Sequence, residues 1–434
     1  MTRLLLSFLL GFAIGSISAA EWPRFRGPNG SGLNRGAVLP SDLNEAELVF
    51  EIEVAGIGHG SPVIWGDHLY LLTAIAEEQS EAPETGKSKK AKGKGKSQPV
   101  SYGWATQCFD RESGELIWEK RFPPDRFKGH RFNSPASSTA AVDEERIVFA
   151  WGTAEALTLV SLDHDGALQW HKTFDGVVGG HGFGGSPILY EGLVILNNDQ
   201  EKQNGNLFAL DAASGEIAWT VERRSERISY SVPCVYDPGD GAVLVFTNWQ
   251  HGFTAIDPED GSVVDDLSVF NTDTNERAIS SPIVAGDLVI GTCGFTANPK
   301  HCVAMRLVDR KWTEVWRIER NVPHIPGVLA VGERVFLVDD SGILTIVERA
   351  TGKELDRARI PDVEGVIYGS PVSDGRHLYF ADESGNLHVL AVADELSPVS
   401  RYSLGETIRT TPAIVEGTLY IRSETKLSAF RAAE

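Results

Sequence analysis

The sequence predicts an all-β fold, an eight-bladed β-propeller of four-stranded antiparallel blades whose ring is closed by an N-terminal strand. Three observations predict it. A strand–turn–strand phrase, clearest from Ala209 to Trp219, returns along the chain at intervals of about 40 to 50 residues. A Ser-Pro or Thr-Pro pair opens most of the repeated units. One alternating strand stands alone before the first unit.

Composition and charge limit the class of protein. The 434 residues are 42% hydrophobic and carry a formal net charge of −20. The apolar content is typical of a globular protein with ample material for a core. A strongly acidic chain repels the phosphates of nucleic acid. We therefore expect no nucleic-acid partner.

Residues 1–20 are predicted to be a signal peptide. Arg3 supplies a positive start, Leu4 to Ile14 an apolar run, and Ser18 to Ala20 a small-residue cleavage site. The apolar run is short for a bilayer span, and no later stretch is long and apolar enough to be one. We expect an exported protein, periplasmic or extracellular, without a transmembrane segment. An uncleaved anchor is the alternative.

Residues 21–46 are predicted to form an N-terminal arm. The stretch is too rich in Gly and Pro for a regular element and too aromatic to be simply disordered. We expect it to lie over the main domain, anchored by Trp22 and Phe25. From Glu47 to Val54 apolar residues then alternate with polar ones, which indicates a half-buried strand.

The repeats follow as one domain, residues 47–434. Pro suits the first position of a strand, where a missing N–H costs least. The predicted openings are Ser61-Pro62, Ser134-Pro135, Ser186-Pro187, Ser281-Pro282, Ser370-Pro371 and Thr411-Pro412, with variants at Ser231-Val232-Pro233 and Ile325-Pro326-Gly327. The last unit has three strands, so the strand from Glu47 to Val54 is predicted to complete it and seal the ring. A seven-bladed count stays open, because the two variant units are weak.

A tryptophan recurs in the fourth strand of several units. These residues are Trp118, Trp170, Trp219 and Trp316. We interpret them as structural, each a large flat ring buried between neighbouring blades. Asp265 and Asp356 hold the same place in two other units.

One segment breaks the period, from Ala76 to Val100. Four glutamates are followed by six lysines interleaved with Gly and Ser. Such a stretch buries too little apolar surface to order itself, so we predict a disordered Lys-rich loop inserted in the first unit. The alternative is a basic tongue that touches an acidic polymer or a membrane surface.

The four cysteines give one candidate disulfide. Cys293 and Cys302 flank a turn-rich loop, and an exported protein permits a bridge between them. The alternative is two buried thiols. No Cys-x-x-Cys spacing is present, so the sequence supports neither a zinc site nor thiol-redox chemistry, and no metal site is predicted.

The repeat, Ala-x-Asp-x-x-Ser/Thr-Gly-x-x-x-Trp with a Ser-Pro opening, resembles that of the pyrroloquinoline-quinone (PQQ) propeller proteins from Leu48 to Phe430. One branch, the quinoprotein dehydrogenases, holds PQQ and calcium and places two adjacent cysteines beneath the quinone. No two cysteines are adjacent here, and the calcium residues of that branch have no clear counterpart. The resemblance therefore points to the non-catalytic, BamB-like branch, which binds partner proteins. No cofactor is expected, and PQQ with calcium belongs to the alternative.

Residues just before the openings are predicted to face the axis of the ring. They combine histidine, arginine and aromatic types that suit a polar pocket for an anion or a sugar. The candidates are His59, Arg131, Asn133, His181, His324, Tyr368 and Arg409, with Tyr230 and Arg277 in equivalent places. His59 and His181 each sit in a Gly-His-Gly phrase, where glycine lets a ligand approach the backbone. The alternative is that these glycines merely fit a crowded inner rim.

The sequence thus favours an exported, non-catalytic propeller that acts as a protein-interaction scaffold in the cell envelope. A PQQ-dependent dehydrogenase and a carbohydrate- or polymer-binding propeller are the alternatives. An enzyme would need a bound cofactor or metal, and a scaffold an exposed partner surface on one rim. A sugar-binding propeller would need exposed aromatics at the channel mouth. We expect a monomer, because a closed ring leaves no need to pair strand edges.

Overall fold

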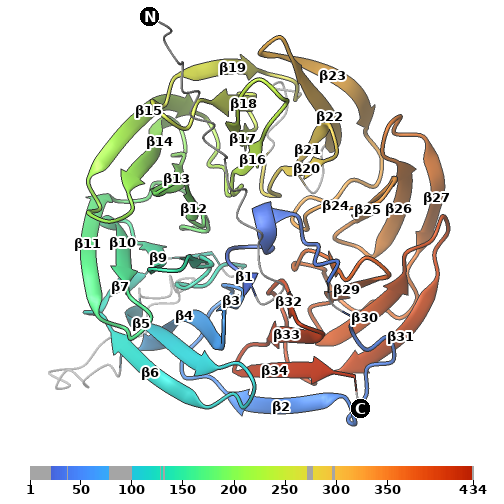
Figure 1. The fold of residues 1–434 in the computed structure, drawn as a ribbon, viewed down its shortest axis with the longest axis horizontal. Coiled ribbons are helices and arrows are strands. Elements are labelled where there is room, and N and C mark those ends of the chain that lie inside the picture. The colour runs from blue at the N-terminus through green and yellow to red at the C-terminus, as the bar shows by residue number, and fades with distance from the viewer. Residues whose placement is uncertain are drawn as a thin grey trace, which may run out of the picture.

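Figure 1 shows the computed structural model, in which eight β-sheets are arranged radially around an axis. The structure describes residues 21–36, 38–77, 100–127, 129–130, 132–270, 277–295 and 299–432. In each blade the first strand is innermost and the fourth is outermost. The prediction of an all-β, eight-bladed propeller is confirmed, and the two weakest units form the fourth and sixth blades.

The first four blades run from β3 to β19. Blade 1 comprises β3 (Val63–Trp65), β4 (His68–Ala76), β5 (Val100–Asp110) and β6 (Leu116–Arg121), with β1 (Glu21–Trp22) paired to β3 and β7 (Asp125–Phe127) paired to β5. Blade 2 comprises β8 (Ala141–Val142), β9 (Ile147–Gly152), β10 (Ala156–Leu162) and β11 (Leu168–Asp175). Blade 3 comprises β12 (Ile188–Tyr190), β13 (Leu193–Asn198), β14 (Gln203–Asp211) and β15 (Ile217–Ser225). Blade 4 comprises β16 (Cys234–Tyr236), β17 (Val243–Asn248), β18 (Gly252–Ile256) and β19 (Val263–Leu267).

The other four blades complete the ring. Blade 5 comprises β20 (Ile283–Ala285), β21 (Leu288–Cys293), β22 (His301–Val308) and β23 (Lys311–Ile318). Blade 6 comprises β24 (Leu329–Val331), β25 (Arg334–Val338), β26 (Ile343–Glu348) and β27 (Glu354–Arg359). Blade 7 comprises β28 (Val372–Ser373), β29 (His377–Ala381), β30 (Asn386–Ala391) and β31 (Pro398–Ser403). Blade 8 comprises β32 (Ala413–Val415), β33 (Thr418–Arg422), β34 (Lys426–Arg431) and β2 (Leu48–Glu53).

The N-terminal strand closes the ring as the sequence predicts. β2 pairs antiparallel with β34, with Ile52 opposite Leu427. Along β2, half-buried and exposed side chains alternate. The last blade is therefore built from both ends of the chain. Opening the ring would require this ladder of hydrogen bonds to break.

The fourth-strand tryptophans dock four of the blades on the blade that follows. Trp219 donates its indole N–H to the Pro258 carbonyl at 2.9 Å and covers Gly261 in the same turn of blade 4. A Cβ at Gly261 would lie 2.7 Å from the Trp219 ring, so glycine permits this contact. Trp118, Trp170 and Trp316 make the same pair of contacts with the turns of the following blades.

A second set of contacts joins the blades at the inner rim. The opening Ser or Thr of one blade accepts a hydrogen bond from a backbone N–H of the preceding blade. The acceptors are Ser61, Thr139, Ser186, Ser281, Ser370 and Thr411, at distances of 2.8 to 3.1 Å. The predicted opening of the second unit at Ser134 is therefore wrong. Thr139 takes that place, although no Pro follows it.

The N-terminal arm lies across the inner strands, near the centre of Figure 1. It holds η1 (Pro28–Gly30), the one helix in the described part of the chain. Trp22 is fully buried, and Phe25 is half-buried. Asn29 exchanges two hydrogen bonds of 2.8 Å with Val235 of blade 4. Leu33 pairs with Ser373 of blade 7. The arm thus bridges blades on opposite sides of the axis.

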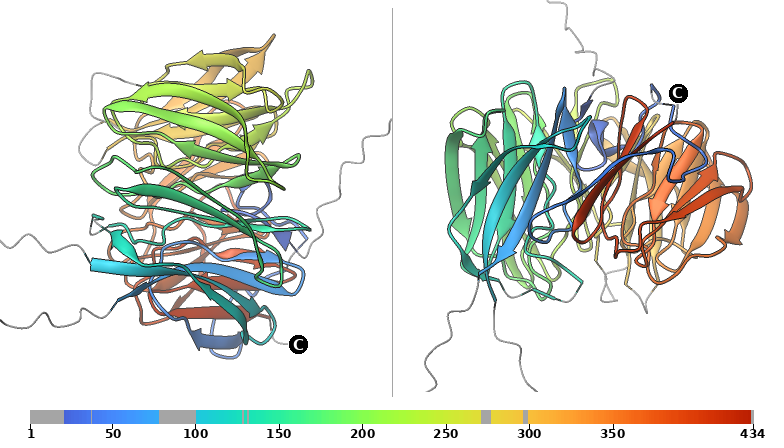
Figure 2. Two further views of the ribbon diagram at one scale, coloured as in Figure 1. Left: turned by 90° about the vertical axis from the view of Figure 1, so that its left-hand side faces the viewer. Right: turned by 90° about the horizontal axis from the view of Figure 1, so that it is seen from below.

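The two faces of the ring carry different connections. Strands alternate in direction within each blade. The links from one blade to the next therefore lie on the same face of the ring as the links between the second and third strands, such as that between β4 and β5, and we call this the cavity face. The turns between the first and second strands and between the third and fourth strands lie on the opposite face together with the N-terminal arm, and we call this the arm face (Figure 2). Most of the predicted loop from Ala76 to Val100 lies outside the described residues, as do residues 1–20. No helix among the described residues is long and apolar enough to cross a membrane.

The predicted disulfide between Cys293 and Cys302 is absent. The register of β21 and β22 pairs Cys302 with Thr292. Side chains alternate along a strand, so Cys293 faces the other side of the sheet. It lies in the core between blades 4 and 5, whereas Cys302 lies in the core shared with blade 6. The alternative of two buried thiols describes the structure.

Candidate functional site: the axial cavity

A cavity of about 1030 Å³ lies on the axis of the ring. Its wall is formed by residues that precede the inner strands, because those links converge on the axis. Six of the predicted residues line it: His59, Asn133, His181, His324, Tyr368 and Arg409. Tyr230 and Arg277 also line it, and Arg131 lies outside the described residues. The positions predicted from the openings therefore converge on one space.

Other lining residues were missed by the sequence analysis. Phe25 reaches the cavity from the arm, and Phe295 and Lys300 come from the link between β21 and β22. Asp339 and Asp340 come from the turn after β25. These residues lie outside the links between blades, where the repeat pattern places the axial positions. The usable signal was the acidic pair directly after a buried strand, on the same face of the ring.

Three histidines of the wall are neutral at pH 7. Burial, together with the charges of Arg409 and Arg422, lowers the pKa of His59 to about 3. Burial lowers the pKa of His181 and of His324 to about 4. Arg277 contributes to both of these shifts. These imidazoles therefore act as neutral hydrogen-bonding groups and aromatic surfaces at pH 7.

The cations of the wall lie near carboxylates. Lys300 Nζ lies 2.9 Å from Asp340, and Arg409 Nη2 lies 2.7 Å from Glu383. Arg409 also lies over the Tyr368 ring, 5.3 Å from its centroid.

At Arg277, two arginines pair with the same carboxylate. Its Nη2 lies 3.6 Å from Glu201, and Arg227 also pairs with that carboxylate. Burial acts to raise the pKa of Glu201. The Gly180 amide and the two guanidiniums outweigh burial and hold that pKa below its usual value.

The two carboxylates that line the cavity are held by hydrogen bonds. Asp339 Oδ1 accepts from the Ser341 amide and hydroxyl and from the Ile343 amide. Asp340 accepts from the amides of His324 and Ile325 as well as from Lys300. Both side chains shape their own turns.

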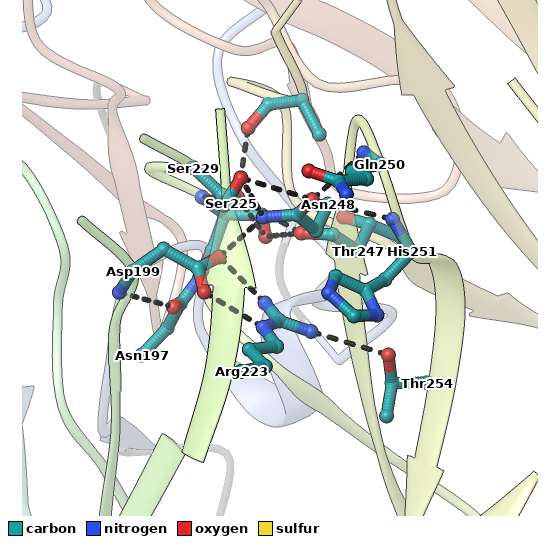
Figure 3. A network of polar contacts seen from close by, with 12 residues as sticks. Asn197, Asp199, Arg223, Ser225, Ser229, Thr247, Asn248, Gln250, His251 and Thr254 are labelled. Atoms are coloured by element: carbon teal, nitrogen blue, oxygen red, sulfur yellow. Dashed lines mark hydrogen bonds and ion pairs between the residues drawn. The ribbon is translucent and has the colours of Figure 1, made fainter. Parts of the chain in front are cut away.

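A buried polar network joins blades 3 and 4 (Figure 3). Arg223 donates to both carboxylate oxygens of Asp199, at 2.7 and 2.6 Å, and to Thr254 at 3.1 Å. Asn248 also donates to Asp199, at 2.7 Å. The side chains of Arg223 and Asp199 are 4% and 0% exposed. Glu201, the partner of Arg277, lies two residues beyond Asp199 on the same link.

The cysteines lie away from the cavity. Cys108, Cys234, Cys293 and Cys302 are all buried in cores between the blades. Among the described residues, no three His, Cys, Asp or Glu side chains are grouped so that they could hold a metal ion.

Comparison with known proteins gives one family. The family described as outer membrane protein assembly factor BamB matches residues 103–358. A protein of that name from Burkholderia pseudomallei (strain K96243) is 22% identical over 402 residues, which is 89% of each chain. BamB from Moraxella catarrhalis superposes with a TM-score of 0.59 at 14% identity, covering 89% of this chain and 98% of that one.

A quinohemoprotein alcohol dehydrogenase from Comamonas testosteroni superposes equally well. Its TM-score is 0.62 at 12% identity, covering 96% of this chain and 81% of that one. At such identities, likeness to a solved structure establishes the fold alone.

Proposed function

Since the chain belongs to the PQQ-repeat family of the outer membrane protein assembly factor BamB, we propose that it is a non-catalytic scaffold that binds protein partners in outer membrane protein assembly. The observation that carries this proposal is the family match over residues 103–358. The relative from Burkholderia pseudomallei bears the same name and aligns over 89% of the chain. The predicted signal peptide supports a place in the cell envelope, on the periplasmic side.

The chemistry of the cavity supports a role without catalysis. A hydrolase or a quinone-dependent dehydrogenase needs a carboxylate or imidazole base that can take up a proton. Asp339 and Asp340 are held in their turns by several donors each. Burial lowers the pKa of His59, His181 and His324 to between about 3 and about 4, which makes these imidazoles weak bases. No adjacent cysteines lie beneath the axis, where the dehydrogenase branch would have them.

Exposed aliphatic side chains on one rim supply a partner surface. They recur at the first or second position of the outer strands, next to the turns of the arm face. They are Val49, Leu116, Leu168, Ile217, Val263, Leu355 and Val399, each 38 to 51% exposed. Their recurrence in seven blades gives this rim an apolar character that single exposed residues lack. The rim is therefore the surface we assign to protein partners.

Genetic complementation tests the proposal. In a strain that lacks the protein, the amount of folded outer membrane protein should fall, and the full chain should restore it. The double variant Leu168→Lys/Ile217→Lys should restore less, because both changes put charge on the arm-face rim. Val178→Lys is the matched control, since Val178 is 45% exposed on the cavity face.

The proposal would be contradicted if the strain that lacks the protein lost a PQQ-dependent dye-reducing activity while its outer membrane proteins were unchanged. A binding measurement separates the two functions directly. Ligands that bind the native state raise the melting temperature in proportion to their occupancy. The proposal predicts no dose-dependent rise when PQQ and calcium are added to residues 21–434. A clear rise would assign the chain to the dehydrogenase branch.

A further inference from the structure

Three neutral polar groups of the axial cavity wall are unpaired. Tyr230, Ser280 and His324 line the cavity from the links before blades 4, 5 and 6. The buried atoms Tyr230 Oη, Ser280 Oγ and His324 Nδ1 have no hydrogen-bond partner among the described residues. Ser280 is 3% exposed and His324 is 8% exposed. Native proteins pair nearly all such atoms, so these three take their partners from molecules that enter the cavity, either water or a ligand.

Contacts along the wall place the three groups near one another. The Tyr230 amide donates to the Ala278 carbonyl at 3.3 Å, and Ser280 follows Ala278 by two residues. Burial raises the pKa of Tyr230 and lowers that of His324, and the charge of Arg277 acts on both. The two hydroxyls and the imidazole therefore lie in one sector of the wall, around the Arg277 side chain.

The unpaired nitrogen of His324 accepts hydrogen bonds. The ring hydrogen-bonds the Gly294 backbone, and Nδ1 is the nitrogen left without a partner. A bond to a backbone carbonyl requires the proton on Nε2, and burial keeps the ring neutral at pH 7 by lowering its pKa to about 4. Nδ1 then presents a lone pair. A ligand must donate a hydrogen bond at this position, which a hydroxyl can do and an ionised carboxylate or phosphate oxygen cannot.

The charged groups that line the cavity are engaged within the described part of the protein. The pairs are Lys300–Asp340, Arg409–Glu383 and Arg277–Glu201, and Asp339 accepts from the amides of Ser341 and Ile343. Arg277 also has an Nε–H without an acceptor among these residues, and a hydroxyl oxygen can accept it. Charges of both signs are thus present and paired, whereas the unpaired groups all suit a ligand that carries hydroxyls.

Aromatic rings provide a stacking surface in the same cavity. Phe295 lies edge-on to His324, with ring centroids 5.9 Å apart. Phe132 lines the cavity, lies 6.2 Å from Tyr368 between centroids, and is 42% exposed. The C–H groups on the face of a sugar ring pack against the electron-rich face of an aromatic ring. An exposed aromatic ring of this kind is the feature expected of a sugar-binding propeller.

We propose that the axial cavity binds a neutral oligosaccharide. One sugar hydroxyl donates to His324 Nδ1, and neighbouring hydroxyls exchange hydrogen bonds with Ser280 and Tyr230. Another ring of the same saccharide stacks on Phe132. The cavity volume of about 1030 Å³ is at the upper end of ligand-sized pockets and has room for more than one sugar ring. The site is separate from the arm-face rim that we assign to protein partners, so either assignment can fail while the other stands.

Titration calorimetry on the purified protein tests the proposal with three neutral trisaccharides: maltotriose, cellotriose and the trimer of N-acetylglucosamine. A trialanine peptide that is acetylated and amidated is the neutral control. We expect at least one sugar to bind about tenfold or more tightly than the peptide. If no sugar bound at about 10 mM, or if the peptide bound as tightly as the best sugar, the proposal would be overturned.

Removal of one hydroxyl locates the sugar in the cavity. Tyr230→Phe deletes a hydroxyl that has no partner among the described residues, so it should lower the affinity for the best sugar about fivefold without loss of stability. Tyr236→Phe is the matched control in the same blade. The Tyr236 hydroxyl donates to the Asp287 carbonyl at 2.8 Å and does not line the cavity. This control should lower stability and leave the affinity unchanged, and the reverse pattern would refute the assignment.

The stacking surface is tested by two changes at one exposed position. Phe132→Ala should weaken sugar binding about tenfold, whereas Phe132→Trp should retain it, because only the second variant keeps an aromatic face. Since Phe132 is 42% exposed, neither change should prevent folding. Equal affinities of the two variants would show that the ring does not contact the sugar and would refute the proposed site.

Discussion

Two buried arginines, Arg223 in blade 3 and Arg277 in the link before blade 5, have opposite surroundings. Each nitrogen of Arg223 donates to a protein acceptor, and its charge is balanced by Asp199 alone (Figure 3). Arg277 leaves Nε without a partner among the described residues, and its Nη2 lies 3.6 Å from Glu201, which also pairs with Arg227. The first arrangement is complete within the protein. The second leaves a guanidinium donor at the wall of the cavity that no described residue accepts.

The largest expected effect concerns the complete arrangement. Arg223→Met should destabilise the protein by about 3 to 5 kcal/mol, because it leaves Asp199 charged and buried without its cation. Arg277→Gln should cost less than Arg223→Met, since Glu201 keeps Arg227. Guanidinium unfolding of both variants measures this. Equal losses would show that the two arginines do not differ in role.

A double variant checks the cause. Arg223→Met/Asp199→Asn removes the stranded charge and should recover part of the stability lost in the single variant. If it were less stable than Arg223→Met, the loss would come from packing and not from the unpaired carboxylate.

The contacts between blades give the second effect. Gly261 has a φ of +75°, and an added Cβ would lie 2.7 Å from the Trp219 ring. Gly261→Ala should therefore cost about 3 kcal/mol, from backbone strain and overpacking together. Gly332 has a φ of +60° and open space around it. Gly332→Ala should cost about 1 kcal/mol from strain alone. Equal losses in thermal unfolding would contradict a close fit between the blades.

Acid should affect the cavity histidines in a predictable direction. His324 has a folded pKa of about 4, below its unfolded value, so the unfolded chain binds more protons between the two. Stability should fall as the pH falls through that window. His324 alone contributes a loss of about 2 kcal/mol between pH 7 and pH 5. His324→Gln should flatten the pH profile of unfolding by that amount.

His251 supplies the opposite sign as a control. It lies 2.8 Å from Asp266, and this hydrogen bond raises its pKa. Its contribution is full below the unfolded pKa and is lost as pH rises through the folded pKa. His251→Gln should therefore lower stability more at acid pH than at neutral pH. Profiles that changed in the same direction for both variants would refute the assigned protonation states.

Sequence reasoning was most reliable where a pattern repeats. The hairpin at Ala209 to Trp219 and the Ser-Pro openings predicted the blades, the closing strand and the positions around the axis. It failed where the position or facing of a single residue determines the structure. The register of β21 places Cys293 on the wrong face for a disulfide, and Thr139 replaces the predicted opening at Ser134. The partners of Arg277 come from a link of blade 3, which no local pattern connects to it.

The smallest effect separates two adjacent serines with opposite roles. Ser281 Oγ accepts the Val232 amide at 2.9 Å, as part of the hydroxyl contacts around the inner rim. Ser281→Ala leaves that buried amide without a partner and should cost about 1 to 3 kcal/mol. Ser280, which is as deeply buried, has a hydroxyl without a partner among the described residues. Ser280→Ala should change stability by less than about 0.5 kcal/mol, because no protein hydrogen bond is lost.

The two serines are adjacent in one loop and are similarly buried, so any disturbance of the loop by the substitution should be similar in the two variants. The difference between their free energies of unfolding then measures the contribution of the hydrogen bond to Ser281. The stability loss should follow Ser281 and not Ser280. If Ser280→Ala were the more destabilising variant, the Ser280 hydroxyl would contribute to the stability of the ring. The contrast between fully paired polar groups and unpaired groups in the cavity wall would then not hold at this position.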